Sequence, residues 1–243
     1  MIEIRRLMKR FGDKVAVKDL TLDVPAGEIF ACLGPNGAGK TTTVKTMAGL
    51  LRPTSGSVRI AGHDIVTETE AAKARMAYVP DEPFLYEKLT GREFLEFVAR
   101  LYGLDRKTAA SRIGALAEAF EFADYMDELA DGYSHGMSQR IVVASALVHE
   151  PDVLLIDEPF VGLDPRSSRR LKDTFARLIA RGAAIFLSTH TLSIAEEVAH
   201  RIGIMSSGEL IACGSRDEIG ARGRDLEDVF FEITEKGNQA GTA

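Results

Sequence analysis

The sequence has little that suits a membrane-spanning or secreted protein. Its longest stretch without Asp, Glu, Lys or Arg covers residues 182–195, which is 14 residues and includes Ser, Thr and His. A spanning helix needs ~20 mostly apolar residues. The first residues alternate apolar and charged side chains, whereas a signal peptide has a basic region followed by a long apolar one. We therefore expect a cytoplasmic protein without a membrane span of its own.

Cysteine and clustered basic residues are also scarce. The two cysteines, Cys32 and Cys213, each lie in an apolar segment, so we expect small core residues in a reducing compartment rather than a metal site. The 243 residues carry 30 Lys and Arg against 36 Asp and Glu, a formal net charge of −6, with no basic tract. This balance argues against a nucleic-acid partner.

Short apolar runs alternate with helical patterns through most of the chain, which is typical of a parallel sheet covered by helices. Residues 29–33, 153–156 and 183–187 are continuously apolar, as strands buried on both faces are. Apolar and polar residues alternate at 20–24 and 57–60, which predicts half-exposed antiparallel strands. We therefore expect an α/β fold with a mostly parallel sheet and a small antiparallel β-subdomain.

Between residues 81 and 150 the strand patterns stop and helical ones take over. Apolar residues recur at helical spacing in two stripes, which are Phe94, Phe97, Val98 and Leu101, then Ile113, Leu116, Ala117 and Phe120. We expect residues 1–220 to form a single domain with a helical subdomain, about 81–150, inserted in the core. Asp164 and Pro165 predict the start of a later helix that ends near Gly182. Residues 221–243 are expected to be a C-terminal tail, disordered from 237 onward.

One segment matches the phosphate-binding pattern G-x-x-x-x-G-K-S/T directly after a buried strand and before a helical run. Glycines let backbone N–H groups point at phosphate oxygens, the lysine adds a positive charge and the hydroxyl of Thr41 is a ligand for Mg²⁺. We expect a P-loop NTPase core. The residues expected to contact the nucleotide here are Gly34, Pro35, Asn36, Gly37, Ala38, Gly39, Lys40, Thr41 and Thr42.

Acidic residues follow the buried run 153–156, at the carboxyl end of a strand, where ligands of open α/β sheets bind. We expect Asp157 to hold Mg²⁺ and Glu158 to accept a proton from the attacking water. The two asparagines, Asn36 and Asn238, do not begin an N-K-x-D motif for guanine, so ATP is favoured over GTP.

The segment Tyr133-Ser134-His135-Gly136-Met137-Ser138-Gln139-Arg140 resembles the L-S-G-G-Q signature of ATP-binding cassette (ABC) proteins, with Ser134 lying 23 residues before Asp157. The order of the other motifs agrees with this family. They are Phe11 at the position of the adenine-stacking aromatic, the loop 78–81, the segment 162–165 after the acids, and Ser188-Thr189-His190 after the last buried strand. The resemblance covers nearly the whole chain.

The resemblance implies roles for individual residues that no single motif indicates by itself. Two cassettes of this family face each other head to tail, so Ser134 and Gly136 would bind the γ-phosphate of the partner's ATP and Asp164 would run along the partner's site. His190 would contact the γ-phosphate and position water, and Phe11 would stack on adenine. The implied partner is a second copy or a homologous cassette.

The sequence departs from the family pattern in two places. Asp81 stands where the family usually has Gln, so it accepts but does not donate hydrogen bonds, and we expect it near the metal. In the signature, His135 replaces a Gly and Met137 a Gln, while Ser134 and Gly136 are kept. We expect a working ATPase site.

The resemblance further implies a separate multispanning membrane subunit, with this chain attached to the cytoplasmic face of the cell membrane through that subunit. The sequences of residues 81–93 and 226–230 are similar to those in cassettes of two-component exporters. The apolar side chains of residues 83–86 stand where the family has its docking groove, and a buried core turn is the alternative interpretation of this segment. The alternatives are a non-transport ABC ATPase acting as a soluble switch, and a P-loop kinase, which would lack the signature.

Overall fold

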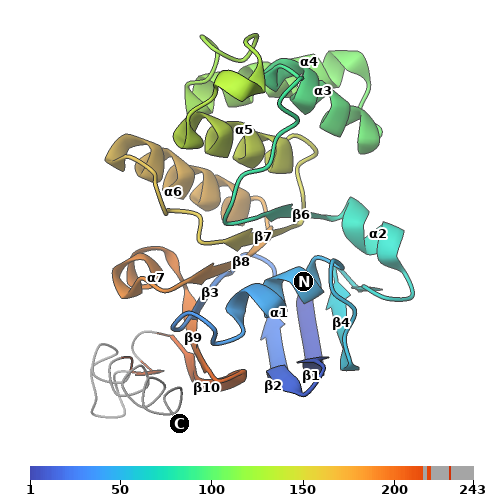
Figure 1. Cartoon of the computed structure of the whole chain (residues 1–243), viewed down its shortest axis with the longest axis vertical. Helices are drawn as coiled ribbons and strands as arrows, with labels where there is room; N and C mark the ends of the chain where they lie inside the picture. The colour runs from blue at the N-terminus through green and yellow to red at the C-terminus, as the bar shows by residue number, and fades with distance from the viewer. Residues whose placement is uncertain (216–217, 220–229, 231–243) are drawn as a thin grey trace.

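The computed structural model describes residues 1–215, 218, 219 and 230 (Figure 1). The tail expected at 221–243, including the segment from 237 expected to be disordered, lies outside the described residues except for Phe230. Within the described ranges, no helix combines the length and the apolar character needed to cross a membrane.

A six-stranded sheet forms the centre of the molecule, in the order β10-β9-β3-β8-β7-β6. The pairs from β9 to β6 are parallel, and β10 pairs antiparallel with β9 at one edge. The three continuously apolar runs of the sequence are β3, β7 and β8, and every residue of these strands is buried. The prediction of a mostly parallel sheet is confirmed. The strands are β3 (Ile29–Leu33), β6 (Met76–Val79), β7 (Val153–Asp157), β8 (Ala184–Thr189), β9 (Arg201–Ser206) and β10 (Glu209–Gly214).

A second, four-stranded antiparallel sheet has the order β2-β1-β4-β5. Ile4 of β1 lies opposite Leu22 of β2 and Val58 of β4, and all three side chains are buried. Thr21 and Asp23, on either side of Leu22, are exposed, so the alternation predicted here is confirmed. These strands are β1 (Ile2–Phe11), β2 (Lys14–Val24), β4 (Ser55–Ile60) and β5 (His63–Asp64).

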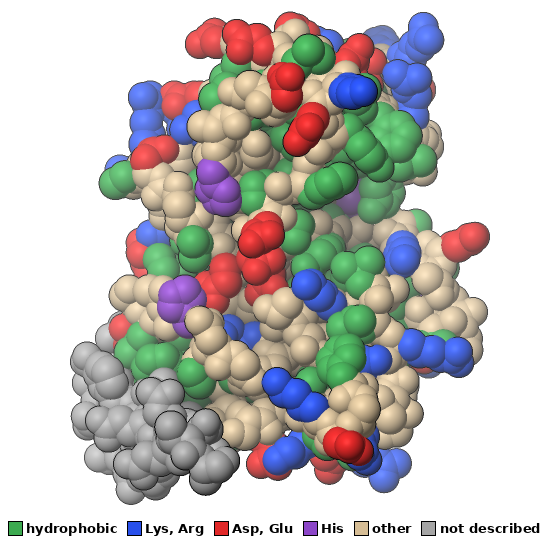
Figure 2. Space-filling view, viewed as in Figure 1, with side chains coloured by type: hydrophobic (Ala, Val, Ile, Leu, Met, Phe, Trp, Pro, Cys, Tyr) green, Lys and Arg blue, Asp and Glu red, His purple; other side chains and the backbone are tan. Residues whose placement is uncertain are grey.

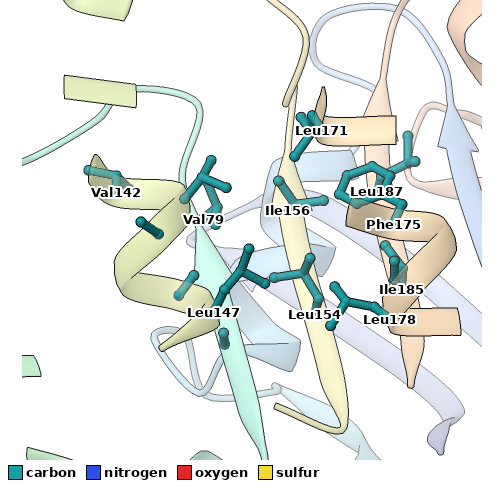
Figure 3. Packing of buried hydrophobic residues seen from close by; sticks show 14 of the residues in the cluster. Val79, Val142, Leu147, Leu154, Ile156, Leu171, Phe175, Leu178, Ile185 and Leu187 are labelled. Atoms are coloured by element: carbon teal, nitrogen blue, oxygen red, sulfur yellow. The ribbon is translucent and has the colours of Figure 1, made fainter. Parts of the chain in front are cut away.

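The buried side chains form two clusters, one on each face of the six-stranded sheet. Because successive strand residues point to opposite faces, Leu155 of β7 packs with helix α1 and the antiparallel sheet, and Ile156 packs with helices α3 to α6. Figure 3 shows the second cluster, with Leu154 of β7 between Leu147 of α5 and Leu178 of α6. Helices α1 and α5 therefore lie on opposite faces of the sheet.

The chain between β6 and β7 is helical, as predicted. Thr90 begins α3 with a capping box, since its hydroxyl accepts from the N–H of Glu93 and the Glu93 carboxylate accepts from the N–H of Thr90. The helices in this segment are α3 (Gly91–Leu101), α4 (Arg106–Phe120), the 3₁₀ turn η1 (Ala130–Gly132) and α5 (His135–Leu147). The other helices are α1 (Lys40–Met47), α2 (Thr69–Ala74), α6 (Pro165–Ala180), whose N-cap is Asp164, and α7 (Leu192–Val198).

Two details differ from the sequence-based expectations. Helix α3 buries Leu95 and Ala99, whereas Phe97 and Leu101 of the predicted apolar stripe are 43% and 68% exposed. Part of that stripe therefore forms surface rather than core. The expectation of two core cysteines is wrong for Cys213, which is exposed on β10, because alternate residues of this edge strand face away from the core.

His149 joins the end of α5 to the sheet and to α3. Its ring stacks on Tyr102 with centroids 3.5 Å apart, and its Nε2 lies 3.1 Å from the carbonyl oxygen of Met76 in β6. Nε2 therefore carries the proton and donates it, while the buried Nδ1 has no hydrogen-bond partner among the described residues. Burial lowers the pKa of His149 to about 4, because a second proton would place an unpaired N–H in the interior.

Because of this histidine, we expect the free energy of unfolding to decrease as the pH is lowered from about 6.5 to about 4. The unfolded chain takes up a proton below its ordinary histidine pKa, and the folded chain does not until its lowered pKa is reached. The free energy of unfolding should therefore drop by up to about 2 kcal/mol between about pH 7.5 and pH 5. Urea titrations of the wild type and of His149→Gln measure this drop, which the variant should lose. His63→Gln, which replaces a more exposed histidine, should keep the drop. If the free energy of unfolding changed equally with pH in all three proteins, the drop would not come from His149.

Candidate nucleotide site

The phosphate-binding loop follows β3 and continues into α1, at the carboxyl edge of the parallel strands. Gly39 has φ +105°, and a Cβ on it would lie 2.4 Å from the carbonyl oxygen of Ala16. A Cβ on Gly34 would lie 2.2 Å from the carbonyl oxygen of Met205. Glycine is therefore required at both positions, because the neighbouring backbone leaves no room for a side chain.

Lys40 begins α1 with its side chain inside the loop. It is only 6% exposed, and its ammonium donates to the carbonyl oxygens of Gly34 at 2.7 Å and Pro35 at 3.1 Å. Thr41 and Thr42 are half-buried in the first turn of the helix, where free N–H groups and the helix dipole favour an anion. Of the other expected contacts, Asn36 and Gly37 are exposed and Ala38 is buried. The loop thus surrounds its lysine and presents backbone N–H groups.

Asp157 ends β7 at the same edge and is fully buried. Its Oδ1 accepts a hydrogen bond from the hydroxyl of Ser188 at the paired position of β8. Its Oδ2 is buried and has no hydrogen-bond partner among the described residues. A buried carboxylate oxygen is costly without a partner, and Mg²⁺ prefers oxygen ligands, so the ion fits this position directly or through water.

Glu158 and His190 lie side by side in the structure. Glu158 has φ +48°, an unusual conformation for a residue with a side chain, and its N–H donates to the carbonyl oxygen of Ser188 at 3.0 Å. Its Oε1 lies 2.8 Å from Nδ1 of His190, and the histidine side chain is 51% exposed. A neutral imidazole has one N–H, so donation to Glu158 and to a phosphate oxygen at once requires the imidazolium form.

Acidic side chains gather near the middle of the face of the molecule that Figure 2 shows, over the region where Figure 1 labels β7 and β8. Asp81 lies two residues after β6, the strand paired with β7, and is exposed. Burial raises the pKa of Tyr78, and the charges of Asp157 and Asp81 raise it further. Asp81 therefore adds negative potential at this edge of the sheet.

We expect Asp81→Gln to raise the rate of ATP hydrolysis by about 2- to 10-fold, because the substitution removes a negative charge near the phosphates and keeps a hydrogen-bonding oxygen. Steady-state phosphate release at saturating ATP and Mg²⁺ measures the change. Glu82→Gln, at the neighbouring exposed acid, is the matched control and should leave the rate unchanged. An unchanged rate in Asp81→Gln would make Asp81 a spectator.

Sequence reasoning gave no separate role to Ser188 or to the hydroxyl of Tyr78. Both belong to segments that it singled out, but the pairing of β6, β7 and β8 is needed to place them beside Asp157. The Tyr78 hydroxyl is buried without a hydrogen-bond partner among the described residues. Ser188 could have been found from its position at the carboxyl end of a second buried run.

The signature segment lies at the start of α5, away from the phosphate-binding loop. Ser134 is exposed and caps α5 by accepting from the N–H of Met137 at 3.3 Å, and Gly136 is half-buried with open space where a Cβ would be. His135 packs beside Gly162, where an added Cβ would lie 3.1 Å from the imidazole ring. Because α5 and α1 cover opposite faces of the sheet, the structure does not bring Ser134 and Gly136 together with Lys40.

Asp164 is held within its own chain. Its carboxylate accepts from the backbone N–H and hydroxyl of Ser167 and, at 3.2 Å, from the guanidinium of Arg140 in α5. These hydrogen bonds, with that from the Ser167 side chain first, lower the pKa of Asp164 to about 2. Arg140 thereby ties the signature helix to the start of α6.

Phe11 ends β1 and is 47% exposed. The ammonium of Lys9 lies 4.9 Å from the centroid of its ring. The aromatic surface is therefore accessible and next to a positive charge, which suits stacking on a base attached to phosphates.

The family model for ABC transporters matches residues 17–161, more than half of the chain. The chain belongs to this family. The ABC transporter ATP-binding protein NatA of Bacillus subtilis (strain 168) is 34% identical over 244 residues, which cover 98% of this chain and 99% of that protein. The daunorubicin resistance ATP-binding protein DrrA3 of Streptomyces coeruleorubidus is 39% identical over 236 residues, which cover 97% of this chain and 74% of that protein.

A solved ATP-binding subunit of an ABC transporter has the same fold, with a TM-score of 0.91 at 34% identity over 96% of this chain and 99% of that one. The fold class inferred from the sequence, an α/β P-loop core with a small antiparallel sheet and added helices, is confirmed. The chain is an ABC-type ATP-binding cassette, an ATPase of the kind that serves transporters.

Proposed function

We propose that this cassette hydrolyses ATP with Mg²⁺ as one of a pair and drives a separate membrane subunit, in the direction of export. The observation that carries the catalytic part is the buried Oδ2 of Asp157, which has no hydrogen-bond partner in the described part of the chain. Glu158 is the next residue along the chain. The direction is supported by relatives such as DrrA3, whose description names resistance to daunorubicin.

Each side chain of the site has a distinct task in this proposal. Lys40 and the N–H groups of the loop bind the β- and γ-phosphates, and Thr41 and Asp157 hold Mg²⁺, which neutralises phosphate charge when bound. Asp81 is a further candidate near the metal. Glu158 takes the proton of the attacking water, and His190 orients the γ-phosphate and that water.

Pairing of two cassettes completes the site. Ser134 and Gly136 are accessible at the N-terminus of α5, but this helix lies on the face of the sheet opposite α1. A second chain turned head to tail would supply these groups to the γ-phosphate, using the same anion-binding property of a helix N-terminus as the loop itself. One chain therefore carries two half-sites.

An exposed aromatic cluster supports attachment to a membrane subunit. We call Phe84, Tyr86, Phe94 and Phe97 the aromatic patch, in which Tyr86 lies 5.6 Å from Phe84, 6.2 Å from Phe94 and 6.3 Å from Phe97 between ring centroids. Phe84 is 69% exposed and Tyr86 50%. Figure 2 shows hydrophobic side chains gathered beside α3. Large exposed apolar clusters mark interaction sites. The aromatic patch begins three residues after Asp81 in the chain, so a partner bound to the patch would be linked through this segment to the nucleotide site.

Affinity purification of the chain from detergent-solubilised membranes tests the proposal, and we expect a multispanning subunit to co-purify. Substituting Phe84 and Phe97 together by Ser should reduce its recovery by roughly 10-fold or more, because aromatic residues dominate interface energies. Ile211→Ser, at an exposed apolar residue on β10, should not. Recovery of only a soluble assembly would favour the non-transport alternative.

A further inference from the structure

A cavity of about 250 Å³ lies between α4, the end of α5 and α6, apart from the nucleotide site. Its apolar lining comes from Leu116, Phe120, Leu147 and Leu178. Figure 3 shows the last two on either side of Leu154 of β7, so this lining is continuous with the packed core. A preformed apolar lining of this kind takes up the hydrophobic part of a ligand.

The rim of the cavity is strongly basic. Its charged lining residues are Arg112, Arg177, Arg181 and Glu150, three guanidinium groups against one carboxylate. Arg112 donates to the carbonyl oxygen of Val148 at 3.0 Å and to Glu150, and Arg181 donates to Glu150 at 2.8 Å. Both arginines are therefore held in place by the same carboxylate. The hydrogen bond from Arg181 lowers the pKa of Glu150, so the glutamate stays ionised at neutral pH.

Arg177 is the third cation and is not neutralised in this way. Its Nη2 donates to the hydroxyl of Thr174 one turn earlier in α6, at 2.9 Å. Within the part of the chain that the structure describes, no carboxylate lies within ion-pair distance of Arg177. Guanidinium groups bind carboxylates and sulfonates through paired, charge-assisted hydrogen bonds.

We propose that this cavity, the arginine pocket, binds an amphipathic organic monoanion whose apolar body lies on Leu116, Phe120, Leu147 and Leu178 and whose carboxylate or sulfonate lies at Arg177. The pocket joins α4, which precedes the signature helix, to α6, which follows Asp157 and Glu158. Such a ligand would also contact Leu147 near the end of α5 and Leu178 near the end of α6, the two helices that Arg140 and Asp164 connect near their starts. The proposal goes beyond ATP hydrolysis and does not depend on it.

Isothermal titration of the full chain with 1-naphthoate tests the pocket without nucleotide. We expect saturable binding with a dissociation constant on the order of 0.1–1 mM, as for a small ligand in a preformed pocket. The neutral 1-naphthylmethanol should bind about 10-fold more weakly and the 1-naphthylmethylammonium cation more weakly still, because the rim carries excess positive charge. Equal affinity for the acid and the alcohol would overturn the proposal, as would no saturation by about 10 mM naphthoate.

Two variants locate the binding. Arg177→Gln should weaken 1-naphthoate about 10-fold or more, while Arg169→Gln, at an exposed arginine of the same helix outside the pocket lining, should leave its affinity unchanged. Ala115→Phe places a ring in the cavity from an exposed position of α4 and should abolish binding without disturbing the core. Unchanged affinity in both Arg177→Gln and Ala115→Phe, with thermal melting like the wild type, would refute the site.

Discussion

Glu158→Gln should leave ATP binding intact and reduce hydrolysis by roughly 10²- to 10⁴-fold, which is about 3 to 5 kcal/mol of barrier. The amide has nearly the same shape as the carboxylate and still accepts the hydrogen bond from His190, but it does not accept the proton of the attacking water. Phosphate release under single-turnover conditions measures the loss. In the proposed pair of cassettes the intact nucleotide stays at the interface, so the variant should also accumulate as an ATP-bound dimer in light-scattering measurements.

Glu118→Gln is the matched control for this substitution. Glu118 is exposed on α4, so the variant should hydrolyse ATP at the wild-type rate and should not accumulate as a dimer. A Glu158→Gln protein that stays monomeric with ATP at every concentration, even with the proposed membrane subunit present, would contradict the proposed arrangement in which Ser134 and Gly136 act on the partner's nucleotide. Hydrolysis at the wild-type rate would remove Glu158 from the reaction.

Lys40→Ala should weaken ATP binding by on the order of 100-fold, about 3 kcal/mol, because it removes a nearly buried positive charge from the loop that surrounds the phosphates. The ammonium, which donates to the carbonyl oxygens of Gly34 and Pro35, is already positioned inside the loop. Displacement of a fluorescent ATP analogue measures the affinity, and a thermal melt checks that the variant is folded.

Lys45→Ala controls for loss of a lysine from the same helix. Lys45 is half-buried in the last turn of α1, at the end of the helix away from the loop. Its removal should change ATP affinity less than about 2-fold, since salt screens the interaction between a charge at that end and the phosphates. If Lys40→Ala bound ATP as tightly as the wild type, the assignment of residues 34–41 to the phosphates would be wrong.

The sequence-based predictions were correct where they depended on residues that are neighbours in the chain, and wrong where they depended on tertiary packing. The buried runs that became β3, β7 and β8, the N-cap at Asp164 and the glycine loop each depend on neighbouring residues in the chain, and the structure contains all of them. The surface character of Phe97 and Leu101 was not predictable in this way, because an apolar stripe does not say which other element covers it. Cys213 was misjudged for a related reason, since its strand lies at a sheet edge.

Other features exist only after the chain has folded. Ser188 and Asp157 are 31 residues apart and meet because β7 and β8 pair in parallel at that register. His149 depends on the packing of α3, α5 and β6, which buries its ring and leaves Nδ1 without a partner among the described residues. The arginine pocket likewise needs α4 and α6 side by side, and no stretch of sequence contains it.

By itself the sequence indicated the chemistry of this protein. It contains a phosphate-binding loop, a signature segment and an acid pair, in the order of an ABC cassette, and no apolar stretch long enough to cross a membrane. Only the tertiary structure decided the relative positions of these motifs. It placed the loop and the acids at one edge of the six-stranded sheet, and α1 and α5 on opposite faces. The physical reason is that motifs are short-range patterns of residue types, whereas the pairing of strands and the burial of two apolar faces fix which motifs meet.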